Sequence, residues 1–316
     1  MPVSFYEVIW IFLIYAFLGW CTEVAYAALD TGKFVNRGFL NGPICPIYGC
    51  GILVVVGILT PLKENLLILF VGSMLLTTVI EFITGFLLEK LFHNQWWDYS
   101  NEPFNLCGYI CLKFSILWGL ACTFVMEIIH PLIYKVIHIF PHIPGLIIMI
   151  ILLVAFASDL GITVASILKF NKRLRLMNEI ADKLKVISNE IGENIYENVT
   201  GAVEKKEELQ EKLEESKENF QDRIEASKEN LQNKIEYSKE NIQDKIEYSK
   251  DNLKKKKEEA LELRKKYEEL LSRKTLGYKR LLKAFPGMKS KIYKDSLNKL
   301  KEYVNENHFF NKNVKK

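Results

Sequence analysis

Apolar residues dominate roughly the first 170 positions of the chain, whereas the remainder is rich in Lys, Glu, Asn and Gln. A helix that crosses a bilayer needs about 20 mostly apolar residues. Five stretches meet this requirement, roughly 5–28, 46–62, 66–92, 108–129 and 145–170. The pattern predicts an all-α membrane bundle of about five transmembrane helices, followed by a long helical tail.

The polar tail repeats every 11 residues from position 215, reading ESKENFQDRIE, ASKENLQNKIE, YSKENIQDKIE and YSKDNLKKKKE. Eleven residues make three helical turns, so the apolar positions recur on one narrow stripe of a helix. That stripe consists of Phe220, Ile224, Leu231, Ile235, Ile242, Ile246 and Leu253. We expect a nearly unbroken helix between Pro144 and Pro286, with Gly192 and Gly201 as its weakest points.

Three structures fit such a tail. A coiled coil between two copies of the chain would bury the stripe and is favoured. A solvated rod is the next alternative, and an amphipathic helix on the membrane surface is the third, because Glu nearly balances Lys. The predicted domains are therefore a transmembrane domain at 1–172, a charged helix at 173–275 and a basic, partly helical segment at 276–316.

The charge balance and the motifs exclude several functions. The net charge is +4, but the signs alternate along the tail, so we expect no nucleic-acid partner. The six cysteines are scattered without zinc-ligand spacing, and we expect neither a metal nor a cofactor. The chain has no GxxxxGK[ST] phosphate loop for ATP hydrolysis.

Lys and Arg in short loops predict the orientation, because they favour the cytoplasmic side. Lys33 and Arg37 lie in the first loop, Lys90 lies in the third, and the run at 169–176 is strongly basic. We expect a multi-pass protein of the cell membrane, surrounded by lipid, with its N-terminus outside and its tail in the cytoplasm. The first and third loops then share the cytoplasmic face.

Charged residues inside apolar stretches are costly and mark ion pairs or functional sites. Glu7, Lys90 and Glu127 fit membrane interfaces. The candidate polar cavity, serving as a substrate or ion path, consists of Glu23, Arg37, Asn41, Glu81, Lys113 and Asp159. A purely structural network of ion pairs and a substrate- or proton-handling site are both open, and the two are compatible.

The segment GFLNGPICPIYGCG at 38–51 concentrates helix breakers where the second apolar stretch begins. Proline lacks the backbone N–H of a helix, and glycine permits close packing or unusual torsions. Irregular backbone at membrane depth is tolerated only inside protein or beside a watery cavity. We expect a broken, re-entrant start to the second span, and a plain packing corner is the alternative. The residues of this motif are Gly42, Pro43, Cys45, Pro46, Tyr48 and Gly49.

A second unusual segment, NQWWDYSNEPFNLCGYICLKF, covers 94–114. Tryptophan and tyrosine are common at membrane interfaces, so an aromatic belt on an interfacial helix accounts for Trp96, Trp97 and Tyr99. This interpretation leaves Asp98 and Asn105 unexplained.

The first segment and the longer stretch 81–120, which contains the second segment, resemble a bacterial family of integral membrane proteins, the ABC-transporter type IV permeases. The resemblance covers about the first 170 residues. It implies a membrane subunit of a transporter. This chain departs from the family pattern at two positions: it has Tyr109 where the family often has Arg, and Cys107 where a polar residue is common. The residues that match the motif are Asn41, Gly42, Pro43, Cys45, Pro46, Tyr48, Gly49, Glu81, Gly85, Glu89, Trp96, Trp97, Asp98, Tyr99, Asn105, Gly108 and Leu112.

Three functions follow, in order of preference. The first is a transport component, not itself an enzyme, with its ATPase on another chain that docks on cytoplasmic segments such as WWDYS. The second is a membrane scaffold that presents the tail to partners, with homo-oligomers forming through the tail. The third is an intramembrane enzyme that uses Cys45, His93, Asp98 or Glu81. Catalysis would require a nucleophile and a base within hydrogen-bond distance, and positions in the sequence cannot show that.

Overall fold

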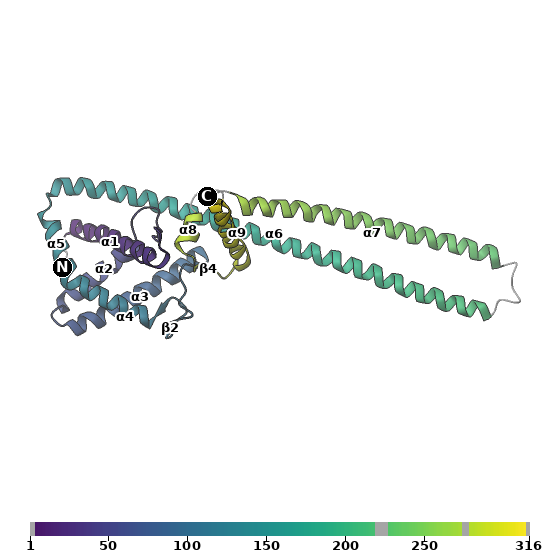
Figure 1. Ribbon diagram of the computed structural model, residues 1–316, viewed down its shortest axis with the longest axis horizontal. Coiled ribbons are helices and arrows are strands. Elements are labelled where there is room, and N and C mark those ends of the chain that lie inside the picture. Colours follow the sequence, from purple (N-terminus) through teal and green to yellow (C-terminus); the bar gives the residue numbers. More distant parts are fainter. Residues whose placement is uncertain (1–3, 219–226, 274–277, 314–316) are drawn as a thin grey trace. The chain divides into compact units, whose positions relative to one another are not determined.

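The structure is a computed structural model and describes residues 4–218, 227–273 and 278–313 (Figure 1). The chain divides into two compact units. Unit 1 comprises Met1–Arg175 together with Lys274–Lys316, and unit 2 comprises Leu176–Arg273. The described residues are mainly helical, and their strands are two residues long. The predicted all-α membrane architecture is confirmed.

Helices long and apolar enough to cross a membrane account for four of the five predicted stretches. They are α1 (Phe5–Thr31), α3 (Leu66–Phe92), the continuous run Leu112–Ile139, and the first part of α6 (His142–Glu218). The remaining stretch, 46–62, corresponds to α2 (Pro46–Leu59) and the short helix η1 (Thr60–Leu62). The 14 residues of α2 span about 21 Å, less than the roughly 30 Å hydrocarbon core. The predicted bounds of this stretch, 46–62, match α2 and η1 together, which form a shorter apolar helix than the four span candidates.

The position of its first residues explains why α2 is short. The backbone N–H of Cys45 donates to the carbonyl of Ala16 at 2.9 Å, so α2 begins level with the middle of α1. Two glycines permit this close approach. A Cβ on Gly19 would lie 2.3 Å from the ring of Tyr48, and one on Gly49 would lie 2.6 Å from the Phe12 carbonyl oxygen. Any side chain at either glycine would force α1 and α2 apart.

The fourth predicted stretch, 108–129, differs from the structure at both ends. Its first residues form a hairpin of β2 (Asn105–Leu106) and β3 (Ile110–Cys111), so α4 (Leu112–Phe124) begins later. Its helix continues past Pro131 through a π-helical turn, η2 (Val125–Ile129), into α5 (His130–Ile139). Proline crowds the carbonyl four residues earlier, and the wider π turn relieves that crowding.

The C-terminal residues of unit 1 form α8 (Tyr278–Ala284), β4 (Lys289–Ser290) and α9 (Lys294–Asn313). We refer to 278–313 as the docked segment. Strand β4 pairs in antiparallel register with β1 (Asn94–Gln95), which follows directly after α3. The docked segment thus adds a strand to the part of unit 1 that contains the WWDYS motif.

Unit 2 is a helical hairpin formed by the second part of α6 and by α7 (Ser227–Ser272), which runs back antiparallel to it (Figure 1). Lys256 on α7 pairs with Glu190 on α6 at 2.9 Å. The expectation of one nearly unbroken helix is wrong, although Gly192 and Gly201 both lie inside α6.

Most of the predicted apolar stripe falls outside the described part of the chain. This applies to Phe220 and Ile224 altogether, and to the side chains of Leu231, Ile235, Ile242 and Ile246. In the structure α7 has its partner helix in the same chain, and a coiled coil between two copies stays a prediction.

Candidate functional site

The helix-breaking motif begins in the non-helical segment that connects α1 to α2, and its residues from Pro46 onward form the first turns of α2. Around Pro43 the chain makes a three-residue turn, in which the N–H of Ile44 donates to the carbonyl of Gly42 at 2.9 Å. Asn36 fixes the preceding residues, because its side chain donates to the carbonyl of Asn41 at 2.7 Å and accepts from the N–H of Gly38 at 3.0 Å. The segment is irregular and has defined hydrogen-bond partners.

Asp159 on α6 satisfies the backbone donors of this segment. Its carboxylate accepts from the N–H of Asn41 at 3.2 Å, from the Asn41 side chain at 2.8 Å and from the N–H of Gly42 at 2.7 Å. The Asn41 side chain also donates to the hydroxyl of Thr163 at 2.9 Å. The structure therefore brings two predicted site residues, Asn41 and Asp159, together as an anchor for backbone that cannot be helical.

Arg280 of the docked segment satisfies the acceptors of the same stretch. Its guanidinium donates to the carbonyls of Gly38 and Leu40, each at 2.8 Å, and to that of Phe39 at 2.9 Å. Burial lowers the pKa of Arg280, and the nearby carboxylate of Asp159 partly counteracts this. Residues 38–42 are thus held between a cation on their carbonyls and an anion on their N–H groups. We call this arrangement the mouth clamp.

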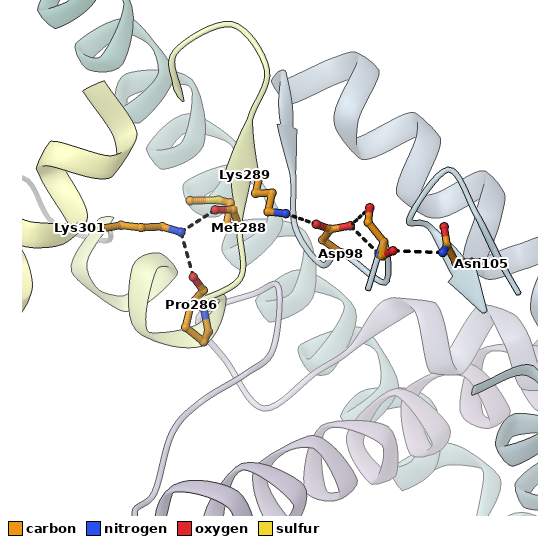
Figure 2. Close-up of polar contacts among 7 residues, drawn as sticks. Asp98, Asn105, Pro286, Met288, Lys289 and Lys301 are labelled. Atoms are coloured by element: carbon orange, nitrogen blue, oxygen red, sulfur yellow. Dashed lines mark hydrogen bonds and ion pairs between the residues drawn. The ribbon is translucent and has the colours of Figure 1, made fainter. Parts of the chain in front are cut away.

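A second attachment of the docked segment runs through Asp98 (Figure 2). The Asp98 carboxylate, 8% exposed, pairs with the ammonium of Lys289 and accepts from the N–H of Ser100 at 2.9 Å. Burial alone would raise the pKa of Asp98, but the hydrogen bonds from Lys289 and Ser100 and the charge of Lys289 lower it. Asn105 extends this network by donating to the carbonyls of Ser100 and Glu102 at 3.2 and 2.8 Å.

The glycine at the hairpin tip permits this arrangement. Cys107 and Gly108 have positive φ values of 55° and 72°, and the N–H of Tyr109 donates to the carbonyl of Leu106 at 3.1 Å, as in a type I′ turn. A Cβ on Gly108 would lie 2.6 Å from a carboxylate oxygen of Asp98. Glycine at 108 therefore allows both the turn and the close approach of the acid.

The docked segment is also stabilised internally. Lys301 on α9 donates to the carbonyls of Met288 and Pro286 at 2.6 and 2.9 Å (Figure 2). These bonds tie α9 to the stretch before β4. Burial, followed by the charge of Lys289, lowers the pKa of Lys301.

Trp96 lies inside the protein and not at a membrane interface. Its side chain is 3% exposed, and its ring contacts those of Phe39, Phe92 and Phe285 at centroid distances of 5.2, 6.4 and 4.9 Å. Residues 94–111 form strands and turns. The expectation of a helix in this stretch is therefore wrong, and Trp96 packs between the docked segment and the first loop.

Trp97 and Tyr109 connect the same region to α3. The indole N–H of Trp97 donates to the carbonyl of Tyr109 at 2.8 Å, and the Tyr109 hydroxyl donates to Glu89 at 2.6 Å. Glu89 also pairs with Lys291 at 2.6 Å. Burial, followed by the hydrogen bond and the charge of Glu89, raises the pKa of Tyr109 to about 12. Lys113 pairs instead with Glu102 at 3.4 Å, and its side chain is 64% exposed.

Two carboxylates of the predicted polar cavity lie close enough to interact electrostatically. Glu23 on α1 accepts from the hydroxyl of Tyr48 at 2.6 Å and pairs with Arg37 at 3.8 Å. Glu81 on α3 accepts from the hydroxyl of Tyr99 at 3.2 Å. Burial raises the pKa of Tyr99 well above its usual range, and Glu81, Cys111 and Glu23 raise it further. We call Glu23 and Glu81 the acid pair.

Comparison with known families adds one result. Residues 10–164 match the model of the family described as "Putative ABC-transporter type IV". The match lies in the N-terminal half of the chain, which is therefore similar to this family. No solved structure matches the chain. The family match includes the acid pair, Asp98 and Asp159, but it ends before Arg280 and the rest of the docked segment.

The contribution of the docked segment to the family region was missed by sequence reasoning. Arg280 and Lys289 are two of many basic residues in the tail, and their partners lie in distant parts of the chain. One signal was present, because Tyr278, Leu281, Leu282 and Phe285 have the i, i+3, i+4, i+7 spacing of a covered helix face. That spacing predicts burial, but it does not identify what the face packs against.

Proposed function

We propose that this protein is a membrane transport component of the permease type, whose ATP-hydrolysing subunit is a separate chain. The observation that carries the proposal is the acid pair, two carboxylates on helices α1 and α3 that lie near each other beside irregular backbone. Ionisable groups in such positions mark substrate or ion pathways. Similarity of the N-terminal half to an ABC-transporter-related family supports the same function.

We propose further that the mouth clamp lies on the cytoplasmic side. The basic run at 169–176 supports this orientation through the distribution of Lys and Arg. An ATPase would then dock on exposed cytoplasmic residues of unit 1. Trp96 is buried and Asp98 is paired with Lys289, so the WWDYS motif itself is a poor contact while the docked segment is in place.

In-cell crosslinking followed by affinity purification from native membranes tests the proposal. We expect to recover an ATPase chain in amounts comparable with the bait. Repeated recovery of the bait without an ATPase, under conditions that recover known ATPase complexes from the same membranes, would reject the permease function.

A membrane scaffold is the second candidate, because unit 2 is joined to unit 1 at both of its ends. A variant with a shortened hairpin separates the two functions. Replacing 198–248 with a short Gly/Ser linker keeps the Glu190–Lys256 pair and the docked segment. A transport component should still recover its ATPase, whereas a scaffold should lose its partners.

We do not favour an intramembrane enzyme. Cys45, the best candidate nucleophile, is buried, and burial followed by the charge of Glu23 raises its pKa to about 12. The thiolate, which is the reactive form, is therefore scarce at neutral pH. Cys45→Ser is expected to leave the function of the protein unchanged, and a loss of function without loss of folded protein would restore the enzyme hypothesis.

A further inference from the structure

Glu81 combines burial with an unused oxygen. Its side chain lies on α3 and is 9% exposed. One carboxyl oxygen accepts from the Tyr99 hydroxyl at 3.2 Å, and the other has no hydrogen-bond partner among the described residues. An ionised carboxylate is poorly tolerated in such a place unless a cation or several donors compensate for the lost water.

The neighbouring cations are engaged elsewhere. Arg37 pairs with Glu23, Lys113 with Glu102, and Lys291 with Glu89. The titratable groups that face Glu81 and Tyr99 from the surrounding elements are Glu23 on α1, Tyr48 on α2 and Cys111 on β3. Tyrosine and cysteine are neutral at pH 7, so Glu23 contributes the main nearby charge. That charge is negative, as the charge of an ionised Glu81 would be.

A metal ion is not a suitable ligand for this site. The described residues contain no group of three or more His, Cys, Asp or Glu side chains that could hold one. Two carboxylates that share a site can instead share a proton, because one of them then stays neutral. The second member, Glu23, is 28% exposed and its partner Arg37 is 30% exposed, so this side of the pair is the more accessible one.

We propose that Glu81 is a proton-binding site, and that the acid pair exchanges this proton with water through the more exposed Glu23. Tyr99 positions the Glu81 carboxyl by donating to one of its oxygens. Binding forms one O–H bond on Glu81 and removes its negative charge, and release reverses both changes. The assignment concerns the site itself, and only the use of the proton in transport rests on the proposed function.

Infrared difference spectroscopy of the full-length protein in lipid vesicles, recorded during a pH titration, tests the assignment. At neutral pH the wild type should show the C=O band of a protonated carboxyl group. Glu81→Gln should abolish that band, and Tyr99→Phe should move it to higher frequency because one hydrogen bond to the carboxyl is lost. Isotope-labelled glutamate in the wild type should shift the band, which assigns it to a glutamate without any variant.

The matched control is Glu89→Gln on the same helix, which should leave the band unchanged because Glu89 is paired with Lys291. A wild type without the band, or a band that survives in Glu81→Gln, would overturn the assignment. The two proposals can fail separately. If Glu81→Gln loses the band but purification recovers no ATPase, the proton site stands and the permease function is rejected. If the band survives in Glu81→Gln but an ATPase is recovered, the permease function stands and the proton site is rejected.

Discussion

Removal of Arg280 should release the docked segment from the mouth clamp. Its guanidinium makes three hydrogen bonds of 2.8 to 2.9 Å to consecutive carbonyls. Hydrogen bonds to a charged group contribute about 1.5–3 kcal/mol each. The three bonds share one partly dehydrated cation, and its lost hydration offsets part of the gain. We therefore expect Arg280→Ala to weaken docking by about 3 kcal/mol, which corresponds to a roughly hundredfold change in the docking equilibrium.

Amide hydrogen exchange measured by mass spectrometry is the suitable assay, because it reports local opening without requiring global unfolding. Exchange of the α8 and β4 amides should accelerate roughly a hundredfold in Arg280→Ala, while α3 amides in the same sample stay unchanged. Lys279→Ala and Lys283→Ala are matched controls, since both side chains are exposed on the same helix. Arg280→Lys should recover only part of the protection, because an ammonium lacks the planar fork of donors.

Two results would refute this reasoning. Protection of α8 in Arg280→Ala that stays within about threefold of the wild type would mean that the clamp contributes less than 1 kcal/mol. Equal acceleration in the Lys279→Ala control would mean that lost helix surface, and not the carbonyl contacts, explains the effect.

Further predictions concern the Asp98 pair and the α1–α2 contact. The pKa of folded Asp98 is lowered, so its contribution to docking is complete above its unfolded pKa of about 3.9 and is lost as the pH falls below that. Distances between spin labels on α3 and α8 should therefore change only in acid. Asp98→Asn should weaken the Lys289 attachment at neutral pH, and its effect should disappear in acid, where Asp98 itself is protonated. Gly19→Ala should reduce the thermal stability measurably because its Cβ would strike Tyr48, whereas Gly51→Ala, with no atom within 4 Å, should not. Equal melting temperatures for the two glycine variants would contradict the packing argument.

The helices were predictable because each depends on its own residues. Long apolar runs require internally satisfied backbone in a membrane, so α1, α3 and the first part of α6 could be predicted from composition alone. The breakers near Pro43 likewise predicted irregular backbone. The close packing of α2 against α1 was not predictable, because it depends on the bond between Cys45 and Ala16 and on glycine contacts across two helices.

The site was predictable as a set of residues but not as a set of roles. Asp159 and Asn41 were expected in one polar cavity, yet Asp159 binds backbone N–H groups, and that role depends on how α6 packs. Arg280 could not be selected, because its partners are carbonyls, which every residue has. Strands of two residues, such as β1 and β4, are too short to show any periodicity.

The mouth clamp has a consequence for biosynthesis. The carbonyl of Gly38 and the guanidinium that binds it are 242 residues apart in the chain. At roughly 5–20 residues per second, the ribosome would add Arg280 about 10 to 50 s after Gly38. During that interval the carbonyls of residues 38–40 must bind water or a temporary donor, even though the helices around them are already in place. A chain interrupted before Arg280 could therefore insert its helices normally and still lack a finished mouth, which gives quality-control proteases a means of recognising incomplete copies.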